Sequence, residues 1–428
     1  AESGAHQPDM LVFRPPHAPA LLHNLRLGFY QNLAFSSVGS VLVALCPDQA
    51  SSLCGPRALW EHCRLCAASP PPQQPHIFAL AREAHEALRA TGKSQAIVLA
   101  GESGSGKTQL AKLGTQLLLE VGTLGSPAPR SPTVTAERHL HCARLLEAFG
   151  STRCTAQNPA DATRFGCVTT IVFDGRGRAA PGGKIQAFLL ELERVANGGA
   201  DGQRNFSVLY QLTTGAEPTL RQRHHIRSSA DYVALARSQF GRSGQLDDRD
   251  DCRGWMETAQ SLTRTFSEKE CGHILSMLSG VLWVGNLGFA EGQPGSPMQL
   301  ANGQEAGGSD TAAEVARLLG VPEADLQRVL TESGAVPLSA AQCCARRDAL
   351  AKHLYGRLFS WMCEAMNGKL SADADDDMSG GCSLVDLPGH ELCETGTLRT
   401  LAFSFLQERL HAHCHRQLWI VEHALYTS

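Results

Sequence analysis

The chain has 428 residues, of which 43% are hydrophobic and 19% are charged, and its formal net charge is −4. This is the composition of a soluble globular protein, and it excludes a global basic field that would attract nucleic acid or an anionic membrane. The length allows two or three domains, or one large domain of several parts.

The sequence shows no pattern typical of a membrane span or a secretory leader. No apolar stretch approaches the ~18 residues that a membrane-spanning helix needs, and the first residues lack a basic segment followed by an apolar one. We therefore expect a cytoplasmic protein and interpret its 15 cysteines as reduced, mostly buried thiols. Cys63 and Cys66 have metal-ligand spacing, but no second Cys or His pair follows at zinc-finger spacing, so buried thiols are the better interpretation.

The first regular elements are predicted before residue 100. Residues 38–45 are apolar and β-branched and predict a strand. Apolar residues at helical spacing between Phe78 and Leu88 predict an amphipathic helix, and residues 96–100 predict the strand that follows it.

Residues 101–108 form a complete G-x-x-x-x-G-K-[ST] phosphate-binding motif directly after that strand. Its glycines let the backbone curl so that N–H groups face phosphate oxygens, while Lys107 can reach the β- and γ-phosphates and Thr108 can ligate Mg²⁺. Apolar residues at helical spacing from 110 to 121 predict a helix whose positive end faces the anion. We predict a nucleoside triphosphate site formed by Gly101, Glu102, Ser103, Gly104, Ser105, Gly106, Lys107 and Thr108.

The middle of the chain is predicted to be mostly helical. Residues 122–134 are interpreted as a loop, and residues 168–173 predict a strand that leads into a hairpin turn at 174–177. Between about 185 and 370, Ser267 with Glu270 forms a capping-box pattern. Further apolar stripes are interpreted as core, with Ser309 or Asp310 capping the helix of Val315, Leu318 and Leu319, and with a later stripe at Leu350, Leu354, Leu358 and Met362.

The last part of the chain contains a second pattern typical of phosphate-binding proteins. After the acidic residues 373–377, which predict a solvated loop, residues 382–387 predict a strand that ends in Asp386-x-x-Gly389. In P-loop enzymes such an aspartate orients the Mg²⁺ shell, and the N–H of the glycine senses the γ-phosphate. The histidines from 411 to 415 lie within a helical pattern, where close neighbours diverge around the axis, so we predict a partly exposed helix there rather than a metal site.

Three stretches resemble the nucleotide site of myosin motor heads. The phosphate-binding loop is similar to the myosin G-E-S-G-x-G-K-T, residues 162–166 (A-T-R-F-G) to the S-S-R-F-G of its first switch, and residues 386–391 (D-L-P-G-H-E) to the D-I-x-G-F-E of its second. Ser105 and residues 358–361 favour an unconventional, class XV-like member. The resemblance covers roughly residues 20–425, with further similar segments in the same order at 24–26, 38–43, 146–150, 189–195, 205–212 and 347–352.

The resemblance implies a role for each matching residue. Lys107 would bind the phosphates, and Thr108, Thr163 and Asp386 would serve the Mg²⁺ ion. Gly389 would donate its N–H to the γ-phosphate. Arg164 would pair with Glu391 to close the site and position the attacking water. ATP and Mg²⁺ are thus the expected ligands, and the actin filament is the expected partner.

Some residues depart from the family pattern. Pro159 and Asp161 replace asparagines of the first switch, so one N–H is missing and a negative charge is added near the anion, and Ala162 replaces a serine near the γ-phosphate. Pro388 and His390 alter the second switch, and residues 46–48 (C-P-D) replace the purine contact. We expect weaker nucleotide binding and impaired hydrolysis.

The resemblance implies an α/β P-loop NTPase fold with a mostly parallel central sheet and a large helical insertion. Residues 1–184 would carry the phosphate-binding loop and the first switch, residues 185–370 a mainly helical region, and residues 371–428 the second switch and a relay-like helix. The resemblance implies that this chain ends before the converter and the lever arm of the family. Residues 334–338 form a shorter segment than the upper actin-contacting loop of the family. We therefore expect that the chain alone does not produce a power stroke.

Two functions follow from these features. One is a divergent motor head that binds MgATP, with ATP-driven movement on actin as its family activity, in an impaired form. The alternative is a non-catalytic scaffold that retains the fold. A GTPase is disfavoured because the sequence has no N-K-x-D guanine motif.

Overall fold

The chain folds into two compact units that are each built from separate stretches of sequence. The first unit comprises residues 1–136, 166–186 and 370–428, and the second comprises residues 137–165 and 187–369. The division of the sequence at residues 184 and 370 stays a prediction. The computed structural model describes residues 6–13, 17–45, 55–65, 74–123, 132–153, 161–174, 179–197, 204–236, 248–291, 297–301, 311–334, 336–371, 378–389 and 398–427.

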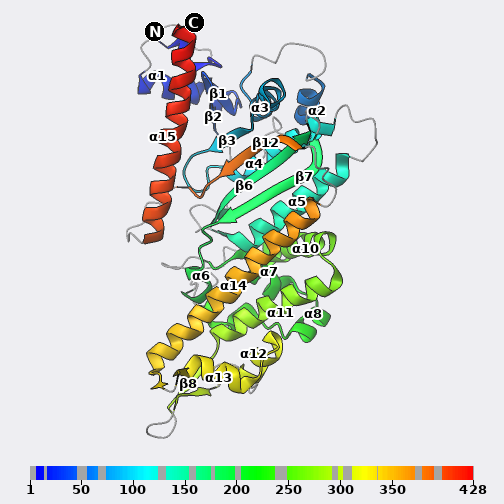
Figure 1. Ribbon diagram of the computed structural model, residues 1–428, viewed down its shortest axis with the longest axis vertical. Helices are drawn as coiled ribbons and strands as arrows, with labels where there is room; N and C mark the ends of the chain where they lie inside the picture. The colour runs from blue at the N-terminus through cyan, green and yellow to red at the C-terminus, as the bar shows by residue number, and fades with distance from the viewer. Residues whose placement is uncertain are drawn as a thin grey trace. The chain divides into compact units, whose positions relative to one another are not determined.

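A four-stranded sheet forms the centre of the first unit (Figure 1). Its strands occur in the order β3 (Gln95–Leu99), β12 (Met378–Asp386), β6 (Gly166–Asp174) and β7 (Ala179–Phe188). Strands β12 and β3 are parallel, with Asp386 opposite Leu99, whereas β12 and β6 are antiparallel. The strands predicted at 96–100 and 168–173 are therefore confirmed within a residue or two at their ends, and the strand predicted at 382–387 is confirmed but begins four residues earlier, at Met378.

The sheet is mixed among its described strands, where the sequence predicted a mostly parallel one. Only β3 and β12 form a parallel pair in the described registers. Strands β6 and β7 are neighbours joined by residues 175–178, which are too few for the crossover that a parallel pair requires. The α/β class is confirmed, and the hairpin is the physical reason for the different strand directions.

Helices α3 (Ile77–Thr91) and α4 (Lys107–Thr123) pack against each other and against β12. Gly114 of α4 allows a close approach, because a Cβ at this position would lie 2.6 Å from Cδ2 of Leu384. The core between these elements contains Phe78, Leu117, Leu118, Ile171, Phe173 and Leu384, each at most 1% exposed. Each such side chain contributes roughly 1.5–3 kcal/mol by burial, so this core fixes α4 and the loop before it relative to β12.

The remaining described elements of the first unit come from the two ends of the chain. Residues 38–45 do not form one strand as predicted, because the chain turns at Gly39, which has a φ of 57°, to make an antiparallel hairpin. The predicted C-terminal helix is confirmed, and its Leu401 and Phe405 are more than half exposed. These elements are α1 (Ala18–Tyr30), β1 (Phe35–Val38), β2 (Val41–Ala44), α2 (Pro56–Leu65) and α15 (Leu398–Thr427).

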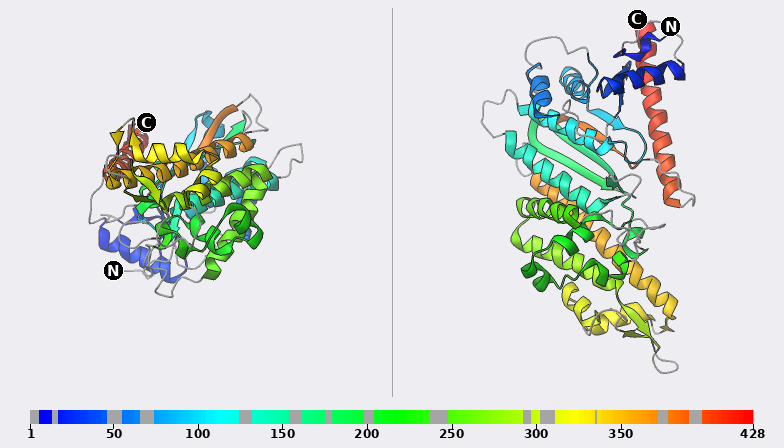
Figure 2. Two further views of the ribbon diagram at one scale, coloured as in Figure 1. Left: turned by 90° about the horizontal axis from the view of Figure 1, so that it is seen from below. Right: turned by 180° about the vertical axis from the view of Figure 1, so that it is seen from behind.

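The second unit is mainly helical, as the periodicity predicted (Figures 1 and 2). Its longest helix, α14 (Ala340–Leu370), has 31 residues. Ser267 caps α11 (Glu268–Gly285) in the predicted reciprocal arrangement with Glu270. The unit also contains β4 (Ser151–Arg153), β5 (Asp161–Thr163), α6 (Glu193–Asn197), α7 (Ser207–Gly215), α8 (Pro218–His224), α9 (Val233–Ala236), α10 (Asp248–Thr265), β8 (Gly288–Ala290), β9 (Gln299–Ala301), α12 (Thr311–Leu319), α13 (Glu323–Thr331), β10 (Glu332–Ser333) and β11 (Val336–Pro337).

Several predicted features fall partly or wholly outside the described residues. The loop predicted at 122–134 is shorter than expected, because α4 continues to Thr123 and helix α5 (Pro132–Gly150) already begins at Pro132. The turn at 175–177, the acidic residues 373–377, the caps at 309–310 and Cys66 lie outside the described residues. Within the described part of the chain, no helix combines the length and the apolar character that crossing a membrane would require.

Candidate nucleotide-binding site

The phosphate-binding motif forms the connection between β3 and α4. Strand β3 ends at Leu99 and the 17-residue helix α4 begins at Lys107. Gly101, Gly104 and Gly106 have φ angles of 154°, 79° and 87°, which L-residues with side chains rarely adopt. Only glycine fits this curled backbone without strain, and the loop leads directly into a helix N-terminus that attracts anions.

Lys107 is buried within the loop at 8% exposure. Its Nζ donates hydrogen bonds to the carbonyl oxygens of Gly101 at 3.0 Å and Glu102 at 2.6 Å. Burial lowers the pKa of Lys107, and the negative charges of Asp386 and Glu102 oppose that shift. The ammonium group is thus placed where the motif needs a cation for phosphate oxygens.

Thr108 and Asp386 meet although 278 residues separate them in sequence. The hydroxyl of Thr108 donates to Oδ2 of Asp386 at 2.6 Å. The meeting follows from the register, because β12 runs parallel to β3 and both strands end at the same edge of the sheet. A hydroxyl oxygen and a buried carboxylate are hard ligands of the kind that Mg²⁺ prefers, so this pair fits the cation expected with a nucleoside triphosphate.

Gly389 lies directly against the phosphate-binding loop. A Cβ built at this position would collide with backbone atoms of Glu102 and Ser103. No residue with a side chain fits there without moving the loop, so the backbone at Gly389 is held within contact distance of the loop backbone. The structure therefore brings Gly101–Thr108, Asp386 and Gly389 together, as the sequence predicted.

Helix α15 contributes to the surroundings of the loop. A cavity of about 600 Å³ is lined by loop residues 100–103, Lys107 and Leu387 on one side and by Gln407, Leu410 and His411 of α15 on the other. The side-chain amide of Gln407 donates to the carbonyl oxygen of Pro388 at 2.7 Å. Helix α15 is thereby linked to the residue next to Gly389.

The predicted first-switch residues belong to the second unit. Thr163 is the last residue of β5 and pairs in register with Ser151 of β4. Arg164 follows, with its side chain 6% exposed. Its Nε donates to the hydroxyl of Thr152 at 2.9 Å, and its Nη1 lies 3.9 Å from Oε2 of Glu191. The guanidinium group is therefore held by residues of its own unit.

The proposed partner of Arg164 lies beyond the described residues. His390 and Glu391 fall in the stretch 390–397, and Pro159 and residues 46–48 are likewise outside the described part of the chain. The ion pair of Arg164 with Glu391 stays a prediction. Ala162, which replaces a serine of the family, is 2% exposed in β5.

Three residues around the site were not singled out from the sequence. Glu191 and Thr152 contact Arg164, and Gln407 contacts the backbone of Pro388. Glu191 lies in the family-like segment 189–195, which could have indicated it. For Thr152 and Gln407 no sequence signal exists, because each contact depends on how separate elements are placed.

A strand, a glycine-rich loop and a helix that bring a lysine, a threonine and a strand-end aspartate together define a phosphate-binding P-loop protein of the α/β class. Comparison with known families gives the narrower assignment. Residues 7–428 match the family model described as myosin head (motor domain), so the chain belongs to this family and is a myosin-type motor-head protein.

Curated relatives agree with the family assignment. Unconventional myosin-Ic of Bos taurus is 31% identical over 405 residues, which are 91% of this chain and 36% of that protein. Myosin-3 of Arabidopsis thaliana is 29% identical over 426 residues, covering 98% of this chain and 35% of the relative. The chain thus spans about a third of the length of the curated relatives it matches. They do not test the class XV-like assignment, which stays a prediction.

Proposed function

We propose that this chain binds MgATP at the site around Lys107 and hydrolyses it slowly, as a motor head whose family activity is ATP-driven movement on actin filaments. The observation that carries the proposal is the hydrogen bond between Thr108 and Asp386 beside the buried Lys107. It joins the two sequence motifs on one sheet edge, which unrelated glycine-rich turns would not do.

Each residue has a role in this proposal. The ammonium group of Lys107 and the N–H groups at the start of α4 bind the phosphate oxygens. Thr108 and Asp386 hold Mg²⁺, and Thr163 provides a further ligand to this ion. Mg²⁺ neutralises charge on the phosphates as it develops. The N–H of Gly389 donates to the γ-phosphate, and Arg164 pairs with Glu391 to orient water and exclude solvent.

A titration with a fluorescent ATP analogue tests nucleotide binding. We expect saturable, Mg²⁺-dependent binding by the wild-type chain and at least about tenfold weaker binding by Lys107→Ala, because a buried charge-assisted contact is lost. Lys93→Ala is the matched control, since Lys93 is exposed just before β3. No saturable binding by a folded wild-type chain would refute the nucleotide site, and stronger competition by GTP than by ATP would refute the choice of nucleotide.

Phosphate release from the same samples separates the motor from the alternative, a non-catalytic scaffold. The alternative is favoured by Ala162, a buried methyl group at a position where the family has a hydroxyl near the γ-phosphate. Binding with phosphate release that is lost in Lys107→Ala would support the ATPase. Binding without any phosphate release would establish the scaffold.

Actin is the proposed partner, and association with the cytoskeleton in the cytoplasm follows from it. Neither nucleic acid nor a membrane is a proposed partner. Cosedimentation with filamentous actin tests this, with and without MgATP. We expect binding that MgATP weakens, and equal pelleting in the presence and absence of filaments would contradict it.

A further inference from the structure

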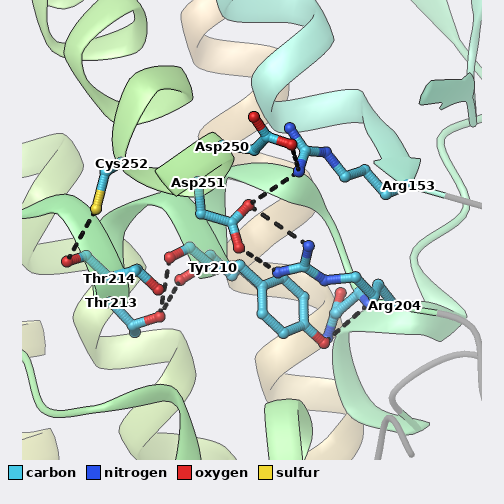
Figure 3. Close-up of polar contacts among 10 residues, drawn as sticks. Arg153, Arg204, Tyr210, Thr213, Thr214, Asp250, Asp251 and Cys252 are labelled. Carbon is cyan, nitrogen blue, oxygen red and sulfur yellow. Dashed lines mark hydrogen bonds and ion pairs between the residues drawn. The ribbon is translucent and has the colours of Figure 1, made fainter. Parts of the chain in front are cut away.

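One buried charged cluster of the second unit is paired within the chain. Figure 3 shows the carboxylate of Asp251 between the guanidinium groups of Arg153 and Arg204. Its oxygens lie 3.9 Å from Nη1 of Arg153 and 2.6 Å from Nη2 of Arg204, and Arg204 also lies over the ring of Tyr210. Because the charges of this cluster satisfy one another, it offers no evident place for a ligand.

The cavity beside the phosphate-binding loop differs from this cluster, because its lining is mainly apolar and side chains do not fill it. Its volume is about 600 Å³. Packed protein interiors have few voids larger than a water molecule, whereas small-molecule sites have volumes of about 300–1,000 Å³. All the residues that line the cavity belong to the first unit. The cavity thus has the size of a small-molecule site and is formed by one unit.

Apolar side chains from three parts of the first unit line the cavity. Val98 and Leu99 are the last residues of β3, and Leu387 directly follows β12. Leu410 of α15 is half-buried and contributes from the helix. A flat ring system placed among these side chains would lose much of its contact with water, which is the main favourable term in the binding of apolar molecules.

The charges of the lining favour an uncharged ligand. Lys107 and Glu102 both line the cavity, and their opposite charges balance. The ammonium group of Lys107 also donates already to the carbonyl oxygens of Gly101 and Glu102. A charged ligand would lose its hydration without finding a free counter-charge, so a neutral molecule fits the lining better.

Helix α15 adds a hydrogen-bond acceptor to the cavity. The side-chain amide nitrogen of Gln407 donates to the carbonyl oxygen of Pro388 at 2.7 Å, which restrains the side chain. Its amide oxygen has no hydrogen-bond partner within the part of the chain that the structure describes. An amide oxygen has two lone pairs, so a restrained and unused one is a preorganised acceptor for a ligand.

We propose that this cavity binds an uncharged, planar aromatic molecule that donates one hydrogen bond to the side-chain oxygen of Gln407. The rings of the ligand pack against Leu99, Leu387 and Leu410. A molecule bound there contacts the phosphate-binding loop and α15 at the same time, and so holds the two together. The inference goes beyond the proposed function, because binding in this cavity requires neither nucleotide nor Mg²⁺.

The test uses two fluorescent probes and the full chain without nucleotide. 2-Aminonaphthalene has two fused rings and an amine that donates, whereas 2-(dimethylamino)naphthalene has the same rings and no donor. The emission of both depends on the polarity of their surroundings. We expect saturable binding of 2-aminonaphthalene at one site per chain, about fivefold tighter than that of the dimethyl probe, because one neutral hydrogen bond distinguishes them.

Two variants of α15 locate the probe. Leu410→Ser removes apolar contact from the cavity and should weaken the binding of both probes about fivefold or more. Leu401→Ser is the matched control, because Leu401 lies on the same helix, is 66% exposed and does not line the cavity. Its affinity should equal that of wild type.

A third variant tests the acceptor. Gln407→Met keeps a side chain of similar length but has no amide oxygen. We expect it to bind the two probes equally well, because the donor of 2-aminonaphthalene has lost its partner.

The outcomes separate this inference from the proposed function. No saturation by about 1 mM probe, or equal loss of affinity in Leu410→Ser and Leu401→Ser, would overturn the site and leave the nucleotide site intact. Equal affinity of wild type for both probes, or a preference retained in Gln407→Met, would overturn the hydrogen bond to Gln407. This second criterion decides if Leu410→Ser does not fold. A chain that binds the probe as expected but binds no nucleotide would refute the proposed function alone.

Discussion

At the scale of single residues, the phosphate-binding loop itself holds the side chain of Lys107 in place. Its ammonium group donates to two loop carbonyls, and burial lowers its pKa against the opposing charges of Asp386 and Glu102. The group has therefore already lost much of its water. When an anion binds, the ammonium group of Lys107 exchanges carbonyl oxygens for phosphate oxygens and does not have to be desolvated again. This lowers the free-energy cost of binding, so high affinity is possible with few contacts.

Asp386 allows a prediction about metal dependence. In Asp386→Asn the hydroxyl of Thr108 keeps an oxygen partner, but the Mg²⁺ site loses its negative charge. We expect affinity for MgATP to fall about tenfold or more, whereas affinity for ATP in excess chelator rises because one negative charge near the phosphates is gone. Titrations with and without Mg²⁺ measure both effects. Asp325→Asn, at an exposed position of α13, is the control, and a parallel loss under both conditions would argue against a metal role.

Gly389 allows a prediction about space. Gly389→Ala places a methyl group against the backbone of Glu102 and Ser103, so either the loop or residue 389 must move. We expect nucleotide binding to be lost and the free energy of unfolding to fall by about 1–3 kcal/mol, the usual cost of overpacking. Nucleotide titration and urea unfolding check this.

A second glycine provides the matched comparison. Gly272 lies in α11 with nothing within 4 Å of a built Cβ, and alanine favours helix. Gly272→Ala should stabilise the chain by up to about 1 kcal/mol and leave binding unchanged. Normal binding by Gly389→Ala would contradict the close approach.

At the scale of elements, the cap of α11 makes stability depend on pH. The N–H and hydroxyl of Ser267, together with Lys369, lower the pKa of Glu270 from an ordinary 4.5 to about 2. Folding thus favours the ionised form. Its contribution is complete above pH 4.5 and is lost as the pH falls toward 2.

We therefore expect Glu270→Gln to lower the urea midpoint at neutral pH and to flatten its fall in acid. Glu268→Gln changes a neighbour in the same helical turn that makes no such cap, and it should behave as wild type. Identical pH profiles for Glu270→Gln and wild type would contradict the role of the cap.

How much the sequence predicts differs between elements. The strand, loop and helix around Lys107 were predicted because a local motif, β-branched residues and helical spacing agree there. The hairpin at 35–44 was missed because apolar β-branched residues resume at Val41, directly after Gly39 and Ser40, so the pattern alone does not locate the turn. In α14 the predicted stripe is buried at Leu358 and Met362, but Leu350 and Leu354 are only half-buried while their neighbours Ala351 and Tyr355 are buried, because tertiary contacts decide which side of a broadly apolar helix is covered.

The site residues that belong to a short sequence motif could be predicted from the sequence. The motif at 101–108 and the strand end at Asp386 were found from sequence. Glu191 and Gln407 were not assigned, because an ion pair and an amide to carbonyl bond between distant segments depend on the placement of α15 and of residues 189–192. The pairing of Arg164 with Glu391 was expected from resemblance and stays a prediction, and the structure shows Glu191 of the same unit as an acceptor near Arg164.

At the scale of the whole molecule, the division into two compact units leads us to expect that a ligand bound mainly by residues of the first unit is detected unequally by different probes. A ligand whose free concentration is 100 times its Kd adds about 2.7 kcal/mol to the free energy of unfolding of the structure that binds it. Lys107, Thr108 and Asp386 all belong to the first unit, whereas the buried Trp255 and Trp283 belong to the second.

We expect MgATP to raise the midpoint temperature of unfolding of the first unit, measured by calorimetry. The midpoint temperature measured from the near-ultraviolet circular dichroism of Trp255 and Trp283 should rise less. Lys107→Ala should remove the shift in both signals. An equal shift of both signals in wild type would mean that the chain unfolds as one cooperative body, and a shift retained in Lys107→Ala would place the ligand elsewhere.

The strand order of the central sheet has a consequence for the newly made chain. Strand β12 lies between β3 and β6, yet it is formed by residues 378–386, long after both neighbours have been synthesised. Until it arrives, β3 and β6 each lack the partner between them and present open edges that can pair with other chains. Asp386 arrives on the same strand, so nucleotide and metal cannot stabilise the sheet before it closes. A growing polypeptide of this kind therefore passes through a long interval in which these two strand edges are unpaired and open to association with other chains.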